Sequence, residues 1–412
     1  MGMDFLGLTL NRIYRRGLLV ASAGEGSVYR VEGEKSLLLK VLTRPLTPRE
    51  VEKLKTLAAF KPKLYHTAIP IEVVIDPATR QPVGFVQPYF AAAVPLTRVL
   101  DSHGRTALKL PNDLAFRVKL CRLLAEAFAR VHAANLVVGD VSDGNFLVGR
   151  NWLGRATVVY VIDCNSFQVT IRTNLGNEFF PSGVATEEYA APEVQLTDWS
   201  TSMRSVYSDS FGFAVLAWKL LFGGSHPFAV ITPRSVDVPP IGERIEKRLF
   251  PFCPGSPIPG NWKAPSTQPS LAVLPVEVRE LFFRAFSSAD PRDRATALEW
   301  SEIFRSWELI LTPSLPFRIL GAWNGSIADR LATTLSTFKP YLGRALVFAV
   351  LVTFALMTTR FDFSRSTSPG GVESHPARLH SDSPRTKSNR PRRIDRDLFP
   401  EPIWNPSPPS KE

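Results

Sequence analysis

The chain has 412 residues, of which 44% are hydrophobic, and this allows one large domain or two ordinary ones with a sizeable core. The formal net charge is +11, but the basic residues are scattered along the sequence, so no specific nucleic-acid partner is expected. Three widely spaced cysteines exclude a disulfide framework and a zinc site and favour a reducing, cytosolic globular part, and no signal peptide opens the chain.

Short β-branched and apolar runs, separated by turn residues, fill residues 10–95. Residues 27–31, 36–42 and 71–75 are predicted strands. One helix interrupts them, from Pro48 to about Phe60, because proline suits a first helical turn and the segment is rich in Glu, Lys and Leu. The pattern predicts a small lobe made of strands and one helix.

From Pro111 onward the pattern becomes mainly helical. Asn112 is predicted to cap a helix whose apolar residues recur at spacings of three and four. Two short strands are predicted next, at residues 146–148 and 158–162. Further helices are predicted over residues 211–222, 275–286 and 295–307.

The end of the chain carries an apolar segment and a polar tail. Residues 345–359 are uncharged and would span roughly 22 Å as a helix, against a bilayer core of about 30 Å. Residues 341–359 would span roughly 28 Å if Arg344 reaches the headgroups. We therefore predict a transmembrane helix there, with a buried domain helix as the alternative. Residues 360–412 are rich in Ser, Pro and Arg and are predicted to be disordered.

A run of small residues, Ala21-Ser-Ala-Gly-Glu-Gly-Ser-Val-Tyr29, lies between two predicted strands. Small residues let a backbone approach phosphates closely, and its free N–H groups then bind them. Lys40 follows within an apolar strand, where an unpaired ammonium is costly. Glu50 or Glu52 on the following helix is the candidate partner. A plain hairpin turn and an edge-strand lysine are the alternatives.

Three polar side chains follow helix or strand ends further along the chain. Asp140 and Asn145 lie in Val138-Gly-Asp-Val-Ser-Asp-Gly-Asn-Phe-Leu-Val148, and Asp163 ends the next apolar strand. Asn145 and Asp163 supply the oxygen ligands that Mg²⁺ prefers. Asp140 is then free to orient or deprotonate an attacking hydroxyl. Any one of the three can be a turn residue, but the set in this order predicts phosphate transfer.

In these motifs the chain resembles the eukaryotic-like protein kinase family over about residues 14–307. Further matches are Gly84-Phe-Val-Gln-Pro-Tyr89, Thr186-Glu-Glu-Tyr-Ala-Ala-Pro-Glu193 and Asp290-Pro-Arg-Asp-Arg294. The resemblance implies an α+β, two-lobed protein-kinase-like fold with a small β-rich N-lobe and a larger, mainly α C-lobe. The expected order is N-lobe at residues 14–90, C-lobe at 91–307, juxtamembrane segment at 308–340, transmembrane helix at 341–359 and disordered tail at 360–412.

The resemblance also implies roles for individual residues. ATP would be bound by Ala21, Ala23, Gly24, Glu25, Gly26, Val28, Lys40, Gln87 and Tyr89. Catalysis would fall on Asp140, Lys40, Asn145 and Glu52, with Glu50 as the runner-up. Mg²⁺ would be held by Asn145 and Asp163, and the acceptor positioned by Thr186. The structural residues would be Glu193, Arg294 as its partner, and Asp209 at the start of the helix that anchors the large lobe.

Several positions depart from the family pattern. Ala21 and Ala23 stand where the first two loop glycines usually are. Gly139 replaces the arginine before the catalytic aspartate, which removes the usual partner of a phosphorylated activation loop. Ser142 replaces a lysine and so removes a cation from the transferring phosphate. Asp163-Cys-Asn replaces Asp-Phe-Gly.

A narrower resemblance is to a divergent bacterial branch, carried by Gly-Glu-Gly-Ser-Val-Tyr, Gly-Asp-Val-Ser-Asp-Gly-Asn, Asp-Cys-Asn-Ser-Phe-Gln and His226-Pro-Phe. Some of its members carry helix-hairpin-helix tails that bind DNA. No such hairpin pair is found after residue 307.

The prediction is therefore a Ser/Thr protein kinase that uses ATP and Mg²⁺ and acts on protein substrates. It would be a single-pass protein of the cell membrane with a cytoplasmic kinase domain; a cytoplasmic protein is the alternative. A nucleotide-binding pseudokinase that acts as a membrane-tethered signalling module is the alternative function, suggested by Ser142 and the two loop alanines. The Ala-Pro-Glu segment disfavours a small-molecule phosphotransferase, and charge alone supports nucleic-acid binding.

Overall fold

The computed structural model describes residues 4–60, 64–151, 154–173, 176–233, 237–267 and 269–312. The predicted transmembrane helix at 341–359, the predicted disordered tail at 360–412 and the juxtamembrane segment beyond residue 312 lie outside these described residues. Within them, no helix has both the length and the apolar character needed to cross a bilayer.

The N-terminal part is a closed antiparallel β-barrel with strand order β1-β2-β3-β4-β6-β5. Its strands are β1 (Asp4–Gly7), β2 (Ile13–Ala23), β3 (Gly26–Val31), β4 (Leu37–Leu42), β5 (Glu72–Ile75) and β6 (Pro82–Pro88). Apolar side chains on one face of the strands fill the barrel, among them Phe5, Leu39 and Val86. The lobe begins at Asp4 and not at residue 14, because β1 pairs with both β2 and β5 and closes the barrel.

Helix α1 (Pro48–Ala59) covers the barrel with one face. Val51 and Leu54 pack against Phe85 of β6. Pro48 occupies the first turn, and Thr47 caps the helix because its hydroxyl accepts the Glu50 amide.

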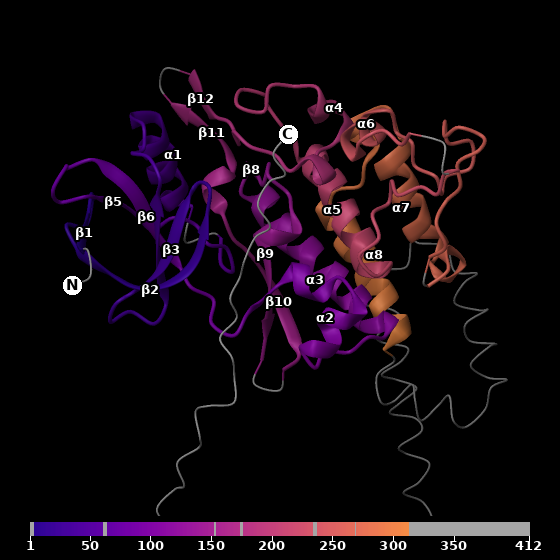
Figure 1. Cartoon of the computed structure of the whole chain (residues 1–412), viewed down its shortest axis with the longest axis horizontal. Helices are drawn as coiled ribbons and strands as arrows, with labels where there is room; N and C mark the ends of the chain where they lie inside the picture. Colours follow the sequence, from indigo (N-terminus) through magenta and orange to yellow (C-terminus); the bar gives the residue numbers. More distant parts are fainter. Residues whose placement is uncertain are drawn as a thin grey trace, which may run out of the picture. The chain divides into compact units, whose positions relative to one another are not determined.

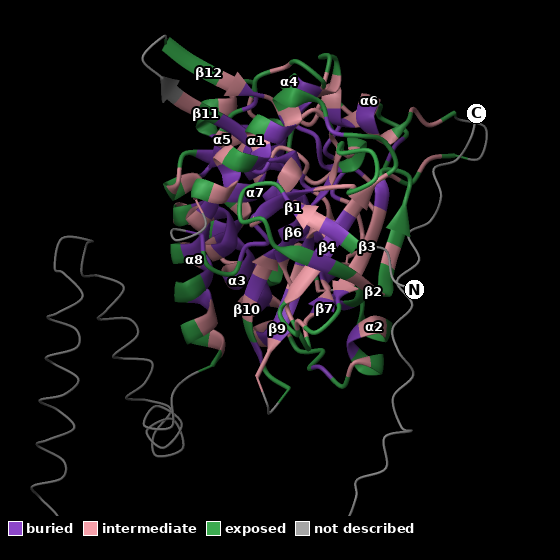
Figure 2. Cartoon of the chain, turned by 90° about the vertical axis from the view of Figure 1, so that its left-hand side faces the viewer, coloured by how far each residue is buried: buried purple, intermediate pink, exposed green. Residues whose placement is uncertain are grey.

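The second lobe is mainly helical (Figure 1). Its elements are β7 (Val94–Pro95), α2 (Ser102–Ala107), α3 (Leu114–Ala133), β8 (Leu136–Val137), β9 (Phe146–Arg150), β10 (Ala156–Val161), β11 (Gln168–Thr173), β12 (Gly176–Phe180), α4 (Pro192–Gln195), α5 (Val206–Leu221), α6 (Ile241–Glu246), α7 (Val276–Ser287) and α8 (Ala297–Leu311). Every residue from Ser208 to Leu221 is buried, so α5 belongs to the core of the lobe. Figure 2 shows buried residues gathered inside the described region and exposed ones along its rim. This arrangement confirms the predicted α+β, two-lobed fold.

The cap of α3 differs from the sequence prediction by one residue. Asp113, and not Asn112, accepts the Phe116 amide at 2.8 Å. Asn112 instead accepts a hydrogen bond from the buried guanidinium of Arg105 at 3.0 Å. The buried arginine needs an acceptor, and this need determines the role of Asn112.

Two small sheets border the region between the lobes. One has the order β10-β9-β7 and the other β12-β11-β8. The loop before β5 joins the first sheet through a parallel bridge between Thr67 and Val161, where the Ala68 amide donates to the Val161 carbonyl at 2.7 Å. The β-rich lobe is thereby fastened to the strand that leads into Asp163.

Candidate active site

The tight turn between β2 and β3 carries the predicted phosphate loop, with Gly24 and Glu25 at its tip. Gly26 opens β3, and a Cβ atom there would lie 2.3 Å from the carbonyl oxygen of Val41. No other residue fits such a close approach of two backbones. The glycine therefore keeps the loop tight against β4, the strand that carries Lys40.

The other predicted loop residues lie on the two paired strands. Ala21 is opposite Val28, Ala23 is opposite Gly26, and Val28 is in turn opposite Lys40 of β4. Directly opposed residues share one face of an antiparallel sheet. The loop residues and the lysine are thus assembled on one face.

Lys40 is 8% exposed and lies among oxygen atoms from two distant segments. Its Nζ donates to Asp163 Oδ1 at 2.5 Å and to Asn165 Oδ1 at 3.2 Å. The carboxylate of Glu25, at the loop tip, is 3.7 Å away. A buried ammonium needs such partners. Asn165, at a position where the family has glycine, was missed as a contact of Lys40.

The predicted helix glutamate does not reach Lys40. Glu50 binds the Arg44 guanidinium with both carboxylate oxygens, at 2.6 and 2.9 Å, and accepts the Thr47 amide. The bond to Arg44 holds the pKa of Glu50 down to about 2. Glu52 is exposed, because the helix turns Val51 and Leu54 toward the barrel. Both candidates are corrected here: the carboxylate beside Lys40 is that of Asp163.

Two basic side chains of α1 instead bind main-chain carbonyls at the end of β12. Lys53 Nζ donates to the Pro181 carbonyl at 2.7 Å, and Arg49 donates to the Phe179 carbonyl at 2.8 Å. The pKa of Lys53 is lowered to about 8, mainly by burial; the charge of Glu50 opposes this shift and that of nearby Arg204 adds to it. The sequence carries no signal for these two contacts, because both acceptors are main-chain carbonyls.

The catalytic-loop residues converge on the carboxylate of Asp140. Thr186 Oγ1 donates to Asp140 Oδ1 at 2.9 Å, and Asn145 Nδ2 donates to the Asp140 carbonyl at 2.9 Å and to its Oδ2 at 3.3 Å. Burial raises the pKa of Asp140, whereas these two hydrogen bonds favour its ionised form. The carboxylate is therefore held in one orientation and keeps an affinity for protons.

Asp209, within the first turn of α5, holds the backbone of the catalytic loop in place. Its buried carboxylate accepts the amides of Val138 at 2.7 Å and Gly139 at 2.9 Å, and it lies 2.9 Å from His132 Nε2. A buried carboxylate that accepts backbone amides is well satisfied. The loop before Asp140 is thus fixed to the core helix of the lobe.

Asn145 and Asp163 supply oxygen atoms suited to a hard divalent cation. The Ile162 amide donates to the Asn145 carbonyl at 2.9 Å, which ties the two segments together. The Asn145 amide nitrogen is used by Asp140, and this leaves its Oδ1 for a cation. In the described part of the chain no three His, Cys, Asp or Glu residues gather as a metal cluster, so phosphate and water oxygens would complete the shell.

The predicted adenine contacts are only partly available. The Tyr89 amide donates to the Ser36 carbonyl at 2.7 Å, so the sheet already uses it. The Arg30 guanidinium lies 3.8 Å from the centre of the Tyr89 ring. Gln87 is buried, and its Oε1 has no hydrogen-bond partner among the described residues. Gln87 therefore retains a free polar atom in this region, whereas Tyr89 is engaged.

Glu193 and Arg294 come together beneath the segment that follows Thr186. The guanidinium donates to both carboxylate oxygens, at 2.6 and 2.8 Å, and its side chain is 1% exposed. It also donates to the Tyr207 carbonyl at 3.2 Å. This bidentate pair joins α4 to the turn before α8.

A buried lysine beside the catalytic loop was missed from the sequence. Lys219 of α5 donates to the Tyr189 hydroxyl at 2.5 Å and to Asp143 Oδ2 at 3.2 Å. The signal was a lone lysine in an otherwise apolar helix, which is costly unless paired. The lysine ties Asp143 of the loop to the segment that ends in Glu193.

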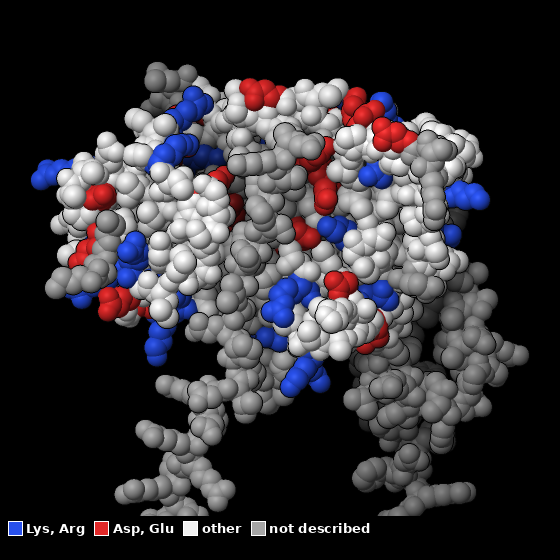
Figure 3. All heavy atoms as spheres, viewed as in Figure 1, with Lys and Arg blue, Asp and Glu red and all other residues white. Residues whose placement is uncertain are grey.

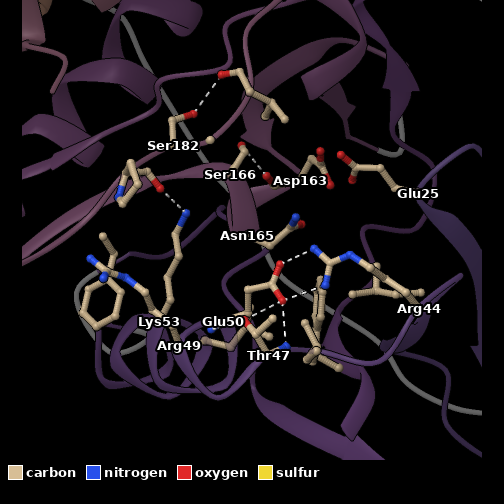
Figure 4. A pocket seen from close by; sticks show the side chains of 18 of the residues that line it. Glu25, Arg44, Thr47, Arg49, Glu50, Lys53, Asp163, Asn165, Ser166 and Ser182 are labelled. Carbon is tan, nitrogen blue, oxygen red and sulfur yellow. Dashed lines mark hydrogen bonds and ion pairs between the residues drawn. The ribbon is translucent and has the colours of Figure 1, made fainter. Parts of the chain in front are cut away.

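A cavity of about 660 Å³ lies between the loop tip, α1 and the segment after β12 (Figure 4). Glu25, Asp163, Asn165 and Lys53 are among the residues that line it. Neither Gln87 nor Tyr89 does so. The cavity therefore adjoins the phosphate end of the predicted ATP site and not its adenine end.

Comparison with known proteins gives two curated relatives of the same name. Protein kinase YegI of Escherichia coli strain K12 is 27% identical over 288 residues, which is 69% of this chain and 43% of the relative. Protein kinase YegI of E. coli O157:H7 matches with the same identity and coverage. The chain thus spans less than half the length of the curated relatives it matches. No family model matches the chain.

Among solved structures, the ROP18 kinase domain in complex with AMP-PNP and sucrose has a TM-score of 0.48 at 17% sequence identity, over 74% of this chain and 83% of that one. The similarity to the two sequence relatives supports a protein-kinase-like protein, and the order and geometry of the site residues agree with it.

Proposed function

We propose that the chain is a Ser/Thr protein kinase that transfers the γ-phosphate of Mg-ATP to protein hydroxyls. The observation that carries the proposal is the convergence of Lys40, Asp140, Asn145 and Asp163 from three segments: β4, the catalytic loop and the end of β10. The protein-kinase name of both E. coli relatives supports it. The scattered basic residues on the face in Figure 3 give no support to a nucleic-acid substrate.

Each residue would have a separate part in the reaction. Mg²⁺, when bound, neutralises charge on the phosphates. Asn145 Oδ1 and the Asp163 carboxylate would hold the cation, and the Lys40 ammonium would bind phosphate oxygens. Asp140 would orient the acceptor hydroxyl and accept its proton, and the burial that raises its pKa makes it the stronger base.

Thr186 supports serine and threonine as acceptors. Its hydroxyl already donates to Asp140 Oδ1 at 2.9 Å, so an aliphatic hydroxyl fits beside this carboxylate. Phosphoamino-acid analysis of the labelled products tests this part: phosphoserine or phosphothreonine is expected, and phosphotyrosine alone would contradict it.

The test of transfer uses the full chain, γ-labelled ATP and Mg²⁺ with a mixture of acceptor proteins. Asp140→Asn keeps the size of the side chain but removes the proton acceptor, so the rate should fall by roughly a hundredfold or more. Asp76→Asn, in a turn of the β-rich lobe, is the matched control and should transfer phosphate at the wild-type rate.

Two results would argue against an enzyme. Equal labelling by wild type and Asp140→Asn would remove the catalytic role of Asp140. Nucleotide-induced thermal stabilisation without any transfer would instead identify the pseudokinase, the alternative suggested by Ser142.

We also propose that residues 341–359 anchor the protein in the cell membrane as a single helix, with the kinase domain in the cytoplasm. The length and apolar character of this stretch support it. Alkaline carbonate extraction of cells that express the full chain should leave it in the membrane pellet, whereas a chain that ends at residue 340 should be released. Release of both would contradict the anchor.

A further inference from the structure

Arg204, in the segment between α4 and α5, lies buried beneath the catalytic loop. The residue is 5% exposed, and its Nη1 donates to the Gly139 carbonyl at 2.5 Å. Gly139 immediately precedes Asp140. The arginine therefore holds the backbone that directs the Asp140 side chain, without touching that side chain itself.

The backbone of Arg204 is fixed just as firmly. Its amide donates to Gln168 Oε1 and its carbonyl accepts from Gln168 Nε2, both at 2.7 Å. Gln168 begins β11 and is paired with Val137 of β8, the strand that leads into the catalytic loop. A chain of hydrogen bonds thus connects Arg204 to the loop from two directions.

Gly139 cannot supply this cation from within the loop. Its φ is +75°, a region that other residues rarely adopt. A Cβ there would lie 2.6 Å from both Cβ and Oγ of Ser182 and 3.4 Å from Arg204 Nη1. The space that a side chain at this position would need is taken by Ser182 and by the arginine.

The charge of Arg204 is balanced at a distance and not by a direct ion pair. Burial lowers its pKa, and the nearby carboxylates of Asp140 and Asp209 raise it again. Its Nε and Nη2 have no hydrogen-bond partner among the described residues. Burying a guanidinium with unpaired N–H groups is unfavourable, and the hydrogen bond to the Gly139 carbonyl and the two nearby carboxylates offset part of this cost.

We propose that Arg204 is a positioning residue for phosphate transfer: from outside the loop it fixes the Gly139 carbonyl, and through it the direction of Asp140. This rests on the function proposed above. Where the family has an arginine within the catalytic loop, this chain has Gly139. Arg204, from a different segment of the chain, contacts the loop instead.

The experiment compares Arg204→Gln and Arg204→Lys in the full chain with a matched control, Arg244→Gln. Arg244 also donates through Nη1 to a carbonyl, that of Phe228 at 2.6 Å, and its Nε likewise lacks a partner among the described residues. It is not part of the catalytic loop. Any general effect of removing an arginine that donates to a main-chain carbonyl should therefore appear in the control.

Amide hydrogen exchange of the loop is the readout that needs no activity. Arg204→Gln should speed exchange at residues 138–145 by roughly tenfold, and Arg204→Lys should restore most of the protection because it still donates one hydrogen bond. Arg244→Gln should leave these amides as in wild type. Unchanged exchange in Arg204→Gln, or the same increase in both Gln variants, would overturn the proposal.

The kinetic readout is a split between kcat and KM. Arg204→Gln should lower kcat by roughly ten- to a hundredfold and leave KM for ATP within about twofold. A wild-type kcat in this variant would overturn the catalytic part.

If wild type itself transfers no phosphate, the proposed function fails, and the exchange result still decides whether Arg204 positions the loop. If Arg204→Gln does not fold, Arg204→Lys serves both readouts: because its shorter ammonium restores most but not all of the contact, protection and kcat somewhat below those of Arg244→Gln are expected, and wild-type values in both readouts would overturn the proposal.

Discussion

His226 illustrates how a single residue couples the segment near the site to pH. Its Nδ1 accepts the Phe228 amide at 3.2 Å, and its Nε2 lies 2.9 Å from the Glu188 carbonyl. This pair of partners requires the neutral ring with the proton on Nε2. Its pKa is lowered to about 4, mainly by burial; the bond to the Glu188 carbonyl opposes this shift, and the charges of Lys219 and Arg244 add to it.

We expect a component of stability that is lost in acid. Above the ordinary pKa of about 6.5 the ring is neutral in both states and has no effect. As the pH falls from there toward 4, the unfolded chain takes up the proton first, so the free energy of unfolding falls by up to about 1.4 kcal/mol per pH unit. Urea unfolding of wild type and His226→Gln between pH 7 and 4 measures this, and parallel pH profiles for the two proteins would contradict it.

The polar residues of the site differ in how far the sequence predicts their neighbours. Asp140, Asn145 and Asp163 were placed together because each follows a strand or helix end, and such ends meet in space. The partner of Lys40 was not predictable in this way, because two glutamates one turn or less apart compete for it. Lys53 and Arg204 bind main-chain carbonyls, and a carbonyl acceptor leaves no trace in the sequence.

At the scale of elements, the beginning of α1 decides where Glu50 lies. Thr47 and Glu50 cap the helix reciprocally, and Arg44 clamps the same carboxylate. The Thr-x-x-Glu spacing is a capping signature that can be recognised from the sequence alone. This spacing favours a capping role for Glu50 over an ion pair with Lys40, because a carboxylate engaged at the cap is not available to the strand.

Glu50→Gln should therefore destabilise helix α1 and leave ATP binding unchanged. Glutamine can still accept the Thr47 amide but loses the ion pair with Arg44, so the free energy of unfolding should fall by up to about 1 kcal/mol, while ATP affinity stays within about twofold. Glu52→Gln, on the exposed face, is the control and should change neither quantity. Thermal unfolding and ATP titration measure both, and a loss of ATP binding at unchanged stability in either variant would restore a glutamate as the partner of Lys40.

At the scale of the whole described region, the sequence does not predict how strands that are far apart in the chain pair to close the barrel. Helices α1, α3, α5, α7 and α8 and strands β3, β4, β5, β9 and β10 follow from apolar spacing and turn residues and lie where they were predicted, whereas the short helices α2, α4 and α6 and the remaining strands were not predicted. Strand β1 was missed because it has four residues and closes the barrel by pairing with β5. Buried Glu72 supports this closure by accepting the Tyr14 hydroxyl at 2.7 Å and the Thr9 amide at 2.9 Å. Such contacts depend on the assembled barrel and not on local pattern.

The central claim is that Lys40, Asn145 and Asp163 form a site for ATP with Mg²⁺, and metal-linked ATP binding tests it most directly. The measurement is the ATP dissociation constant of the full chain with and without Mg²⁺, for wild type, Asp163→Asn and the control Asp76→Asn. We predict that Mg²⁺ tightens binding by roughly tenfold or more in wild type and in the control, and that Asp163→Asn loses this effect. Affinity that does not respond to Mg²⁺ in wild type, or the same response in Asp163→Asn, would contradict the account.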